Sequence, residues 1–345
     1  MHYLAEYGIF FAKLITVIIA ILILLAGTVA IATKGKYKEK EKLEVNKLND
    51  KYDRMRELIQ QETLNKHEQK ALAKQRKAEQ KVEKKLDKQH KKPSRKKMFV
   101  VSFHGDLKAS AVVSLRNEIT AILTAATPQD EVVVNLESMG GVVHGYGLAA
   151  SQLMRLRTAN IPLTIIIDKI AASGGYMMAC VGNKILAAPF AIIGSIGVIA
   201  QLPNFNKVLK KHHVDYEQIT AGKYKRTLTL FGENTKEGRE KFKEEIEEVH
   251  QHFKDFIVNN RPAIDIERVA TGEYWQGIRA FELKLIDELR TSDDYLLAAS
   301  KNADIYEVKH SIKKSIGEKV GLTAQTAIDK VTGYMKHSET ESRYN

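Results

Sequence analysis

Short apolar segments that alternate with helix-forming segments constrain the fold of this chain more than any other feature. Apolar strands are expected at 98–103, 131–136, 163–168 and 184–187. Strands that alternate with helices are typical of an α/β fold with a largely parallel sheet. Because such sheets collect their functional residues at the carboxyl ends of the strands, we expect the site in the loops that follow them.

Longer stretches of helical periodicity lie between and after these strands. They predict helices over 111–126 and 235–258, and a further helix that ends near residue 157. A last helix and a strand at 305–308 follow. The α/β domain is therefore expected over 98–310, and a weakly ordered tail over 311–345.

The N-terminal part, residues 1–33, is expected to be a membrane anchor. Leu14 to Ala32 is a run of 19 residues without charge, which is long enough for a helix to cross a hydrocarbon core of about 30 Å. A buried core helix and a signal peptide cleaved after Ala32 are the alternatives. Lysines crowd the C-terminal flank of the run, and the positive-inside rule then favours a cytoplasmic catalytic domain.

The excess of positive charge belongs to one segment, residues 34–97. The chain has 54 basic and 42 acidic residues, and this segment holds 23 of the basic and 11 of the acidic ones. The remainder is neutral, so no nucleic-acid partner is expected. The segment is rich in helix formers, which predicts a charged helical spacer, either solvated or self-associating.

Three loops after the strands carry the residues that suggest chemistry. They contain Gly140-Gly141, Ser173-Gly174-Gly175 and Gly194-Ser195. A serine at a strand-to-helix turn exposes its hydroxyl, and glycines leave backbone amides open to an oxyanion. Each loop alone is typical of an ordinary turn, whereas three in order indicate a nucleophilic site.

Several other kinds of site find little support in the sequence. The single cysteine, Cys180, excludes an internal disulfide framework. The eleven histidines are scattered, and no phosphate-binding glycine motif is present. We therefore expect no metal and no cofactor.

From Met98 to about Leu289 the chain resembles the signal peptide peptidase A family of serine peptidases, in its shorter membrane-anchored branch. The motifs that carry the resemblance occur in order and at family-like spacing. They are Gly140-Gly141, Ala172-Ser173-Gly174-Gly175-Tyr176, Gly194-Ser195-Ile196-Gly197-Val198, Gly222-Lys223-Tyr224-Lys225 and Gly272-Glu273-Tyr274-Trp275-Gln276-Gly277.

The resemblance implies a ClpP/crotonase-like fold of repeated ββα units and a Ser/Lys dyad. It assigns Ser173 as the nucleophile and Lys225 as the general base and acid, rather than Lys223, because the family's lysine follows the aromatic position held by Tyr224. A lysine amine with its ordinary pKa near 10.4 is protonated at neutral pH, so the base must lie in an apolar site.

The resemblance also assigns the supporting roles. Ser195 would orient the lysine amine, and the amides of Gly141 and Gly174 would form the oxyanion hole. Relatives with one catalytic unit per chain complete the dyad between neighbouring subunits, so a homo-oligomeric ring is implied. Two positions depart from the family pattern: Met139 stands where proline is common, and Lys284 where glycine is common.

The function expected is that of a membrane-anchored serine endopeptidase. Its expected substrates are hydrophobic or unfolded peptides, such as signal-peptide remnants or damaged envelope proteins. The implied location is the bacterial inner membrane, with a single pass and the side of the catalytic domain left open. A crotonase-like acyl-CoA enzyme and a non-catalytic membrane scaffold remain the alternatives.

Overall fold

The computed structural model describes residues 8–11, 13–18, 21, 41–88 and 95–312. It divides into two compact units, one of Met1–Lys42 with Ser311–Asn345 and one of Leu43–His310. The four-part division expected from composition stays a prediction.

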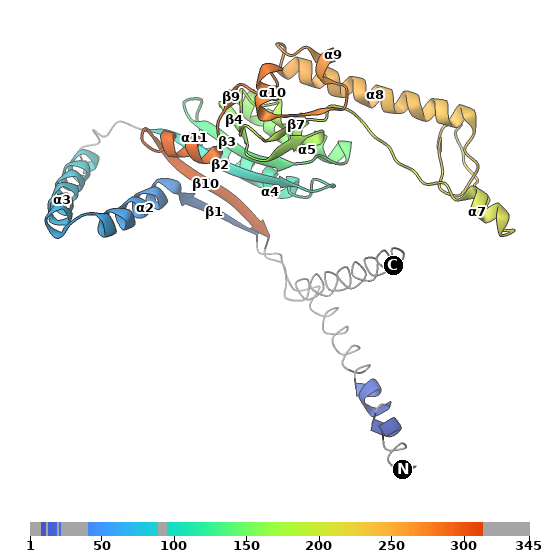
Figure 1. Ribbon diagram of the computed structural model, residues 1–345, viewed down its shortest axis with the longest axis horizontal. Helices are drawn as coiled ribbons and strands as arrows, with labels where there is room; N and C mark the ends of the chain where they lie inside the picture. The colour runs from blue at the N-terminus through green and yellow to red at the C-terminus, as the bar shows by residue number, and fades with distance from the viewer. Residues whose placement is uncertain (1–7, 12, 19–20, 22–40, 89–94, 313–345) are drawn as a thin grey trace, which may run out of the picture. The chain divides into compact units, whose positions relative to one another are not determined.

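A mixed α/β architecture built on one sheet confirms the expected fold class (Figure 1). Along its main path the strands are β1 (Glu41–Lys47), β10 (Ala303–Ile312), β2 (Lys96–Gly105), β3 (Glu131–Ser138), β4 (Leu163–Ile167), β6 (Lys184–Ala187) and β9 (Glu288–Leu289). The pairings from β10 to β9 are parallel. The expected strands therefore exist and lie side by side.

A short second arm leaves the main sheet at the end of β3. Strand β5 (Ile170–Ala172) pairs with β3 and with β7 (Ile192–Gly194), and β7 pairs antiparallel with β8 (Tyr274–Gln276). Strands of three residues carry no periodicity that sequence analysis can detect. This arm nevertheless brings three distant loops to one edge.

The two faces of the sheet bury different residues, as period-two alternation requires. In β2, Val101 and Phe103 face a large cluster that includes α4 (Val112–Ala125) and α5 (Val143–Thr158). Met98 and Val100 face a smaller cluster against α11 (Ser292–Ala299). Both faces are covered, which explains why the strands read as continuous apolar runs.

The segment after the expected anchor contains a strand as well as helices. The helical prediction is confirmed for α2 (Leu48–Thr63) and α3 (Lys66–Lys88), and it is wrong for Glu41–Lys47, which forms β1. This strand exists because it pairs with β10. Such a long-range partner overrides the local preference of a charged sequence for helix.

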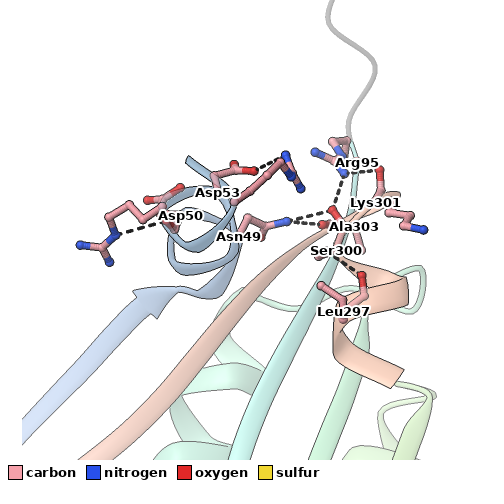
Figure 2. A network of polar contacts seen from close by, with 10 residues as sticks. Asn49, Asp50, Asp53, Arg95, Leu297, Ser300, Lys301 and Ala303 are labelled. Carbon is pink, nitrogen blue, oxygen red and sulfur yellow. Dashed lines mark hydrogen bonds and ion pairs between the residues drawn. The ribbon is translucent and has the colours of Figure 1, made fainter. Parts of the chain in front are cut away.

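One buried side chain fixes the start of α2 to the sheet (Figure 2). The Asn49 amide group donates to the carbonyls of Ser300 (3.1 Å) and Ala303 (3.0 Å), and its oxygen accepts from the Ile305 amide (2.8 Å). Nearby, Lys47 pairs with Asp304 at 3.0 Å. The root of the helical segment is therefore part of the α/β unit.

A long helix, α8 (Lys236–Asn260), is anchored at its C-terminal end. Phe253 and Ile257 are buried in the core, and Arg261 forms a two-pronged ion pair with Asp287. The helix extends from there away from the sheet toward α7 (Asn206–Lys211) (Figure 1). The expected long charged helix is thus confirmed, and only its C-terminal part is buried against the core.

Two short helices, α9 (Ile266–Val269) and α10 (Gly277–Glu282), complete the unit. Helix α10 ends at Glu282, and Lys284, two residues later, has a left-handed φ of 62°. The Leu285 amide closes the turn on the Ala280 carbonyl at 2.9 Å. The departure from glycine at this position therefore falls on a helix end, as expected.

None of the helices within the described residues is both long and apolar enough to cross a bilayer. Most of the run 14–32 lies outside the described residues. The membrane anchor therefore stays a prediction, as does the character of the tail, which lies outside them beyond residue 312.

Candidate active site

Ser173 occupies a strained backbone turn between β5 and α6 (Gly174–Ala179). Its φ is 51° and its ψ is −119°, a conformation that non-glycine residues rarely adopt. The turn is held by its amide, which donates to the Gly194 carbonyl (2.7 Å), and by its carbonyl, which accepts from Met177 (3.0 Å). Strain fixed by neighbouring structure is the signature of a nucleophile elbow.

The first glycine loop lies directly against this turn. A Cβ atom placed on Gly140 would come within 2.7 Å of the Gly174 nitrogen and 2.9 Å of the Ser173 Cβ. Gly140 also has a φ of 86°, which favours glycine on its own account. The absence of a side chain here is therefore what allows the two loops to meet.

The third loop joins the same edge through the short strands. Ala172 of β5 pairs with Gly194 of β7, and Ser138 of β3 pairs with Ala171. Ser195 follows at a φ of 51°, and its amide donates to the Glu273 carbonyl at 2.6 Å. The predicted convergence of the three loops is confirmed, while the roles of their residues stay predictions.

The two amides assigned to an oxyanion hole are Gly141 and Gly174. Within residues 95–312 neither donates to another backbone carbonyl. Gly174 is the first residue of α6, where a helix leaves its amides without internal partners. Gly141 is packed against the backbone of Leu107, which leaves no room for a side chain. Both positions suit the stabilisation of an oxyanion.

A buried network that the sequence analysis missed supports the Gly140 loop. The Tyr146 hydroxyl donates to the Asp106 carbonyl (2.8 Å), so the Ser138 hydroxyl must donate to the Tyr146 oxygen (2.5 Å). The Ser138 oxygen in turn accepts from the Gly140 amide (3.0 Å). Burial raises the pKa of Tyr146, which keeps this hydroxyl protonated. The one feature of the sequence that could have indicated this network is Ser138, a serine at the end of a buried strand.

Lys225 does not meet Ser173 within one chain. It is exposed, and its segment is tied to the N-terminal end of α8 by the ion pair of Lys223 with Glu237 (2.8 Å). The buried end of α8 begins at Phe253, and a helix rises about 24 Å over the 16 residues from Glu237. The apolar surroundings expected for the lysine amine are therefore not supplied by its own chain.

Metal ligands do not cluster near this edge. Across the described part of the chain, no three His, Cys, Asp or Glu side chains gather in a way that could hold a metal ion.

A strained serine between strand and helix, with glycines beside it, defines a class of hydrolases that act by acyl transfer. Comparison with protein families agrees. The model of the peptidase family S49 N-terminal region matches residues 2–153, and that of peptidase family S49 matches residues 155–306. The chain belongs to peptidase family S49, and its function is that of a peptidase.

Individual relatives extend over most of the chain. "Probable protease SohB" of Haemophilus influenzae is 45% identical over 349 residues, covering 99% of both chains. A protein of the same name from Buchnera aphidicola subsp. Schlechtendalia chinensis is 48% identical over 305 residues, covering 86% of this chain and all of the relative. The resemblance drawn from the motifs is thus confirmed.

Proposed function

We propose that the chain is a membrane-anchored serine endopeptidase with a Ser/Lys dyad and a ClpP/crotonase-like arrangement of ββα units. Ser173 is the nucleophile, Lys225 the general base and acid, and Ser195 the hydroxyl that orients the lysine. The observation that carries the proposal is the backbone of Ser173, at a φ of 51° against Gly140. Strain of this kind persists where a function requires it.

The reaction follows from these groups. The Lys225 amine takes the proton of the Ser173 hydroxyl, and the serine oxygen attacks the peptide carbonyl. The developing oxyanion accepts from the amides of Gly141 and Gly174, each contributing roughly 3–4 kcal/mol of transition-state stabilisation. Lys225 then protonates the leaving amine and activates the water that hydrolyses the acyl-enzyme.

The dyad is completed between subunits of a ring, of about eight copies by resemblance. Two features support this. Lys225 lies on an extension that is tied to α8 at Glu237. Along the helix, Glu237 is about 24 Å from Phe253, where the buried part of α8 begins. The same extension exposes apolar side chains that water does not favour, among them Ile199 (79% exposed) and Ile219 (95% exposed). A neighbouring copy would cover them and enclose the lysine amine.

The substrates are hydrophobic or unfolded peptides presented near the bacterial inner membrane. Two large apolar side chains border the glycine loop: Met139, 76% exposed, and Leu107, 70% exposed. Such groups bind apolar peptide side chains. The charge-free run 14–32 supplies a single membrane pass.

The test is active-site labelling of the full chain in detergent with a fluorophosphonate probe, alongside hydrolysis of an unfolded fluorogenic protein. Ser173→Ala should lose both labelling and hydrolysis. Ser151→Ala is the matched control, because Ser151 is an exposed serine on α5, and it should keep both.

Persistent labelling of Ser173→Ala would overturn the assignment of the nucleophile. Hydrolysis of acyl-CoA without any hydrolysis of peptides would favour the crotonase-like alternative instead.

A further inference from the structure

Helix α3 carries its exposed lysines on a single face. Lys66, Lys70, Lys74, Lys77 and Lys81 follow one another at intervals of four, four, three and four residues, and all are exposed. At 3.6 residues per turn they fall within an arc of about 80°. We call these five residues the lysine face. The sequence repeats the same spacing through Lys84 and Lys88.

Among the described side chains of α3, none neutralises the lysine face. Within the described residues, none of its five lysines forms an ion pair. Glu68 follows Lys66 by two residues and so lies on the far side of the helix. Solvated helices more often alternate their charges along one face. Lysines three and four apart repel one another, so this arrangement disfavours the isolated helix.

The face points away from α2. The side of α3 toward α2 is marked by Gln69, whose amide donates to the carbonyls of Gln61 (2.7 Å) and Leu64 (3.0 Å). Gln69 lies about 60° from Lys66 and about 100° from the middle of the lysine face. The turn is fixed by Asn65, whose oxygen caps the amides of His67 and Glu68. The lysines are therefore presented to a partner outside the helix pair.

The base of this helix pair is held firmly. Asn49 donates to the carbonyls of Ser300 and Ala303 (Figure 2) and accepts from the Ile305 amide, and α2 begins one residue before it. Glu41 follows Ala32 by nine residues, which span at most about 32 Å when extended. Strand β1 adds seven residues before α2 begins at Leu48, so connectivity over these 16 residues allows the start of the pair to lie up to about 55 Å from the end of the apolar run.

We propose that the lysine face binds anionic lipid headgroups on the surface of the membrane in which the chain is anchored. The inference rests on the anchor of the proposed function. The lysine face, about 23 Å long from Lys66 to Lys81, is complementary to a plane of negative charge. Nucleic acid is the other polyanion, but only the lipid surface is tethered to this chain, through the anchor of the proposed function.

The function of such contacts is orientation. One membrane span leaves the domain free to rotate and tilt, whereas a second attachment through a rigid helix pair restricts both. The catalytic edge would then keep a constant relation to the bilayer, from which apolar substrates emerge.

The experiment uses the full chain with a single environment-sensitive fluorophore on a new cysteine. Ala73→Cys borders the lysine face, and Gln75→Cys, on the opposite side, is the matched control. Cys180 is fully buried and stays unlabelled. The chain is reconstituted in vesicles of phosphatidylcholine alone or mixed with phosphatidylglycerol, and quenching by aqueous iodide is measured.

We expect the label at residue 73, and not that at residue 75, to be protected from iodide only in anionic vesicles. High salt should reverse the protection. Each lysine contributes about a fivefold gain in partitioning near an anionic surface, so Lys70→Gln/Lys74→Gln/Lys77→Gln should weaken it roughly 100-fold.

A variant with unchanged composition separates the effect of where the lysines lie from the effect of net charge. This variant moves two lysines to the opposite side of α3. It combines Glu68→Lys/Lys70→Glu with Lys74→Gln/Gln75→Lys on the Ala73→Cys background. It should lose the protection although its net charge is that of the parent.

Equal quenching in both lipids would overturn the proposal, and so would protection that survives this redistribution. Protection by an added RNA oligonucleotide, without any difference between lipids, would assign the face to nucleic acid. Co-sedimentation with the neutral vesicles reports on the anchor separately. A chain that fails to sediment with them, but is protected by anionic ones, would refute the anchor and support the lysine face.

Discussion

At the scale of single residues, the positions with left-handed backbone reveal where structure is under strain. Lys284 adopts a φ of 62° just after the end of α10. A side chain in this conformation costs roughly 1–2 kcal/mol that glycine avoids. Lys284 lies outside the candidate active site, whereas the strained backbone of Ser173 lies within it.

We therefore expect Lys284→Gly to raise the free energy of unfolding by about 1 kcal/mol. Denaturant titration of the full chain in detergent measures the change. Lys284→Ala keeps the strain and removes only the side chain, so it should give no gain. An equal gain from both variants would locate the effect in the side chain rather than in the backbone.

Sequence analysis singled out residues whose local chemistry is distinctive and missed residues whose role depends on packing. Ser173 and its glycines stand out because three glycine-rich loops follow one another in order, although each loop alone is typical of a turn. Tyr146 does not stand out, because a tyrosine in a helix is ordinary until its hydroxyl is found beside Ser138. The exposed position of Lys225 in its own chain also could not be predicted from the sequence, because it depends on the direction in which α8 extends from the core.

At the scale of elements, the glycine loop and the serine turn act as one unit. Gly140→Ala would put a methyl group within 3 Å of both Ser173 and Gly174, in a backbone that already has a φ of 86°. The turn must then shift by a large part of an ångström. Displacements of about 1 Å cost roughly 100-fold in rate, and we expect that loss in kcat/KM for Gly140→Ala.

Gly147→Ala is the matched control for this substitution. A Cβ atom at Gly147, inside α5, meets no atom within 4 Å. It should leave kcat/KM unchanged and stabilise the helix by about 0.5–1 kcal/mol. If Gly140→Ala retained full activity on the same peptide substrate, the close contact between the two loops would not matter for catalysis.

The regular elements were predictable, and the irregular ones were not, for the same physical reason. Strands such as β3 bury both faces and therefore read as apolar runs. Strand β1 exposes most of its residues and forms through its pairing with β10, a partner more than 250 residues away. No local pattern encodes such a partner.

At the scale of the whole molecule, the account requires at least two copies of the chain. The serine edge and the lysine extension both belong to the described unit of Leu43–His310, but α8 carries Lys225 away from Ser173. A head-to-tail ring places the extension of each copy over the serine of the next. The ring itself is a proposal, and its consequence is that catalysis belongs to the interface.

The most direct test of this claim is complementation between two inactive variants, Ser173→Ala and Lys225→Ala, carrying different tags. Each alone should be inactive. After co-expression and sequential purification through both tags, mixed rings should hydrolyse an unfolded protein substrate at about a quarter of the wild-type rate, because random assembly joins an intact serine to an intact lysine at one interface in four. Mixed assemblies as inactive as either variant alone would contradict the account, since a dyad formed within one chain cannot be restored by mixing.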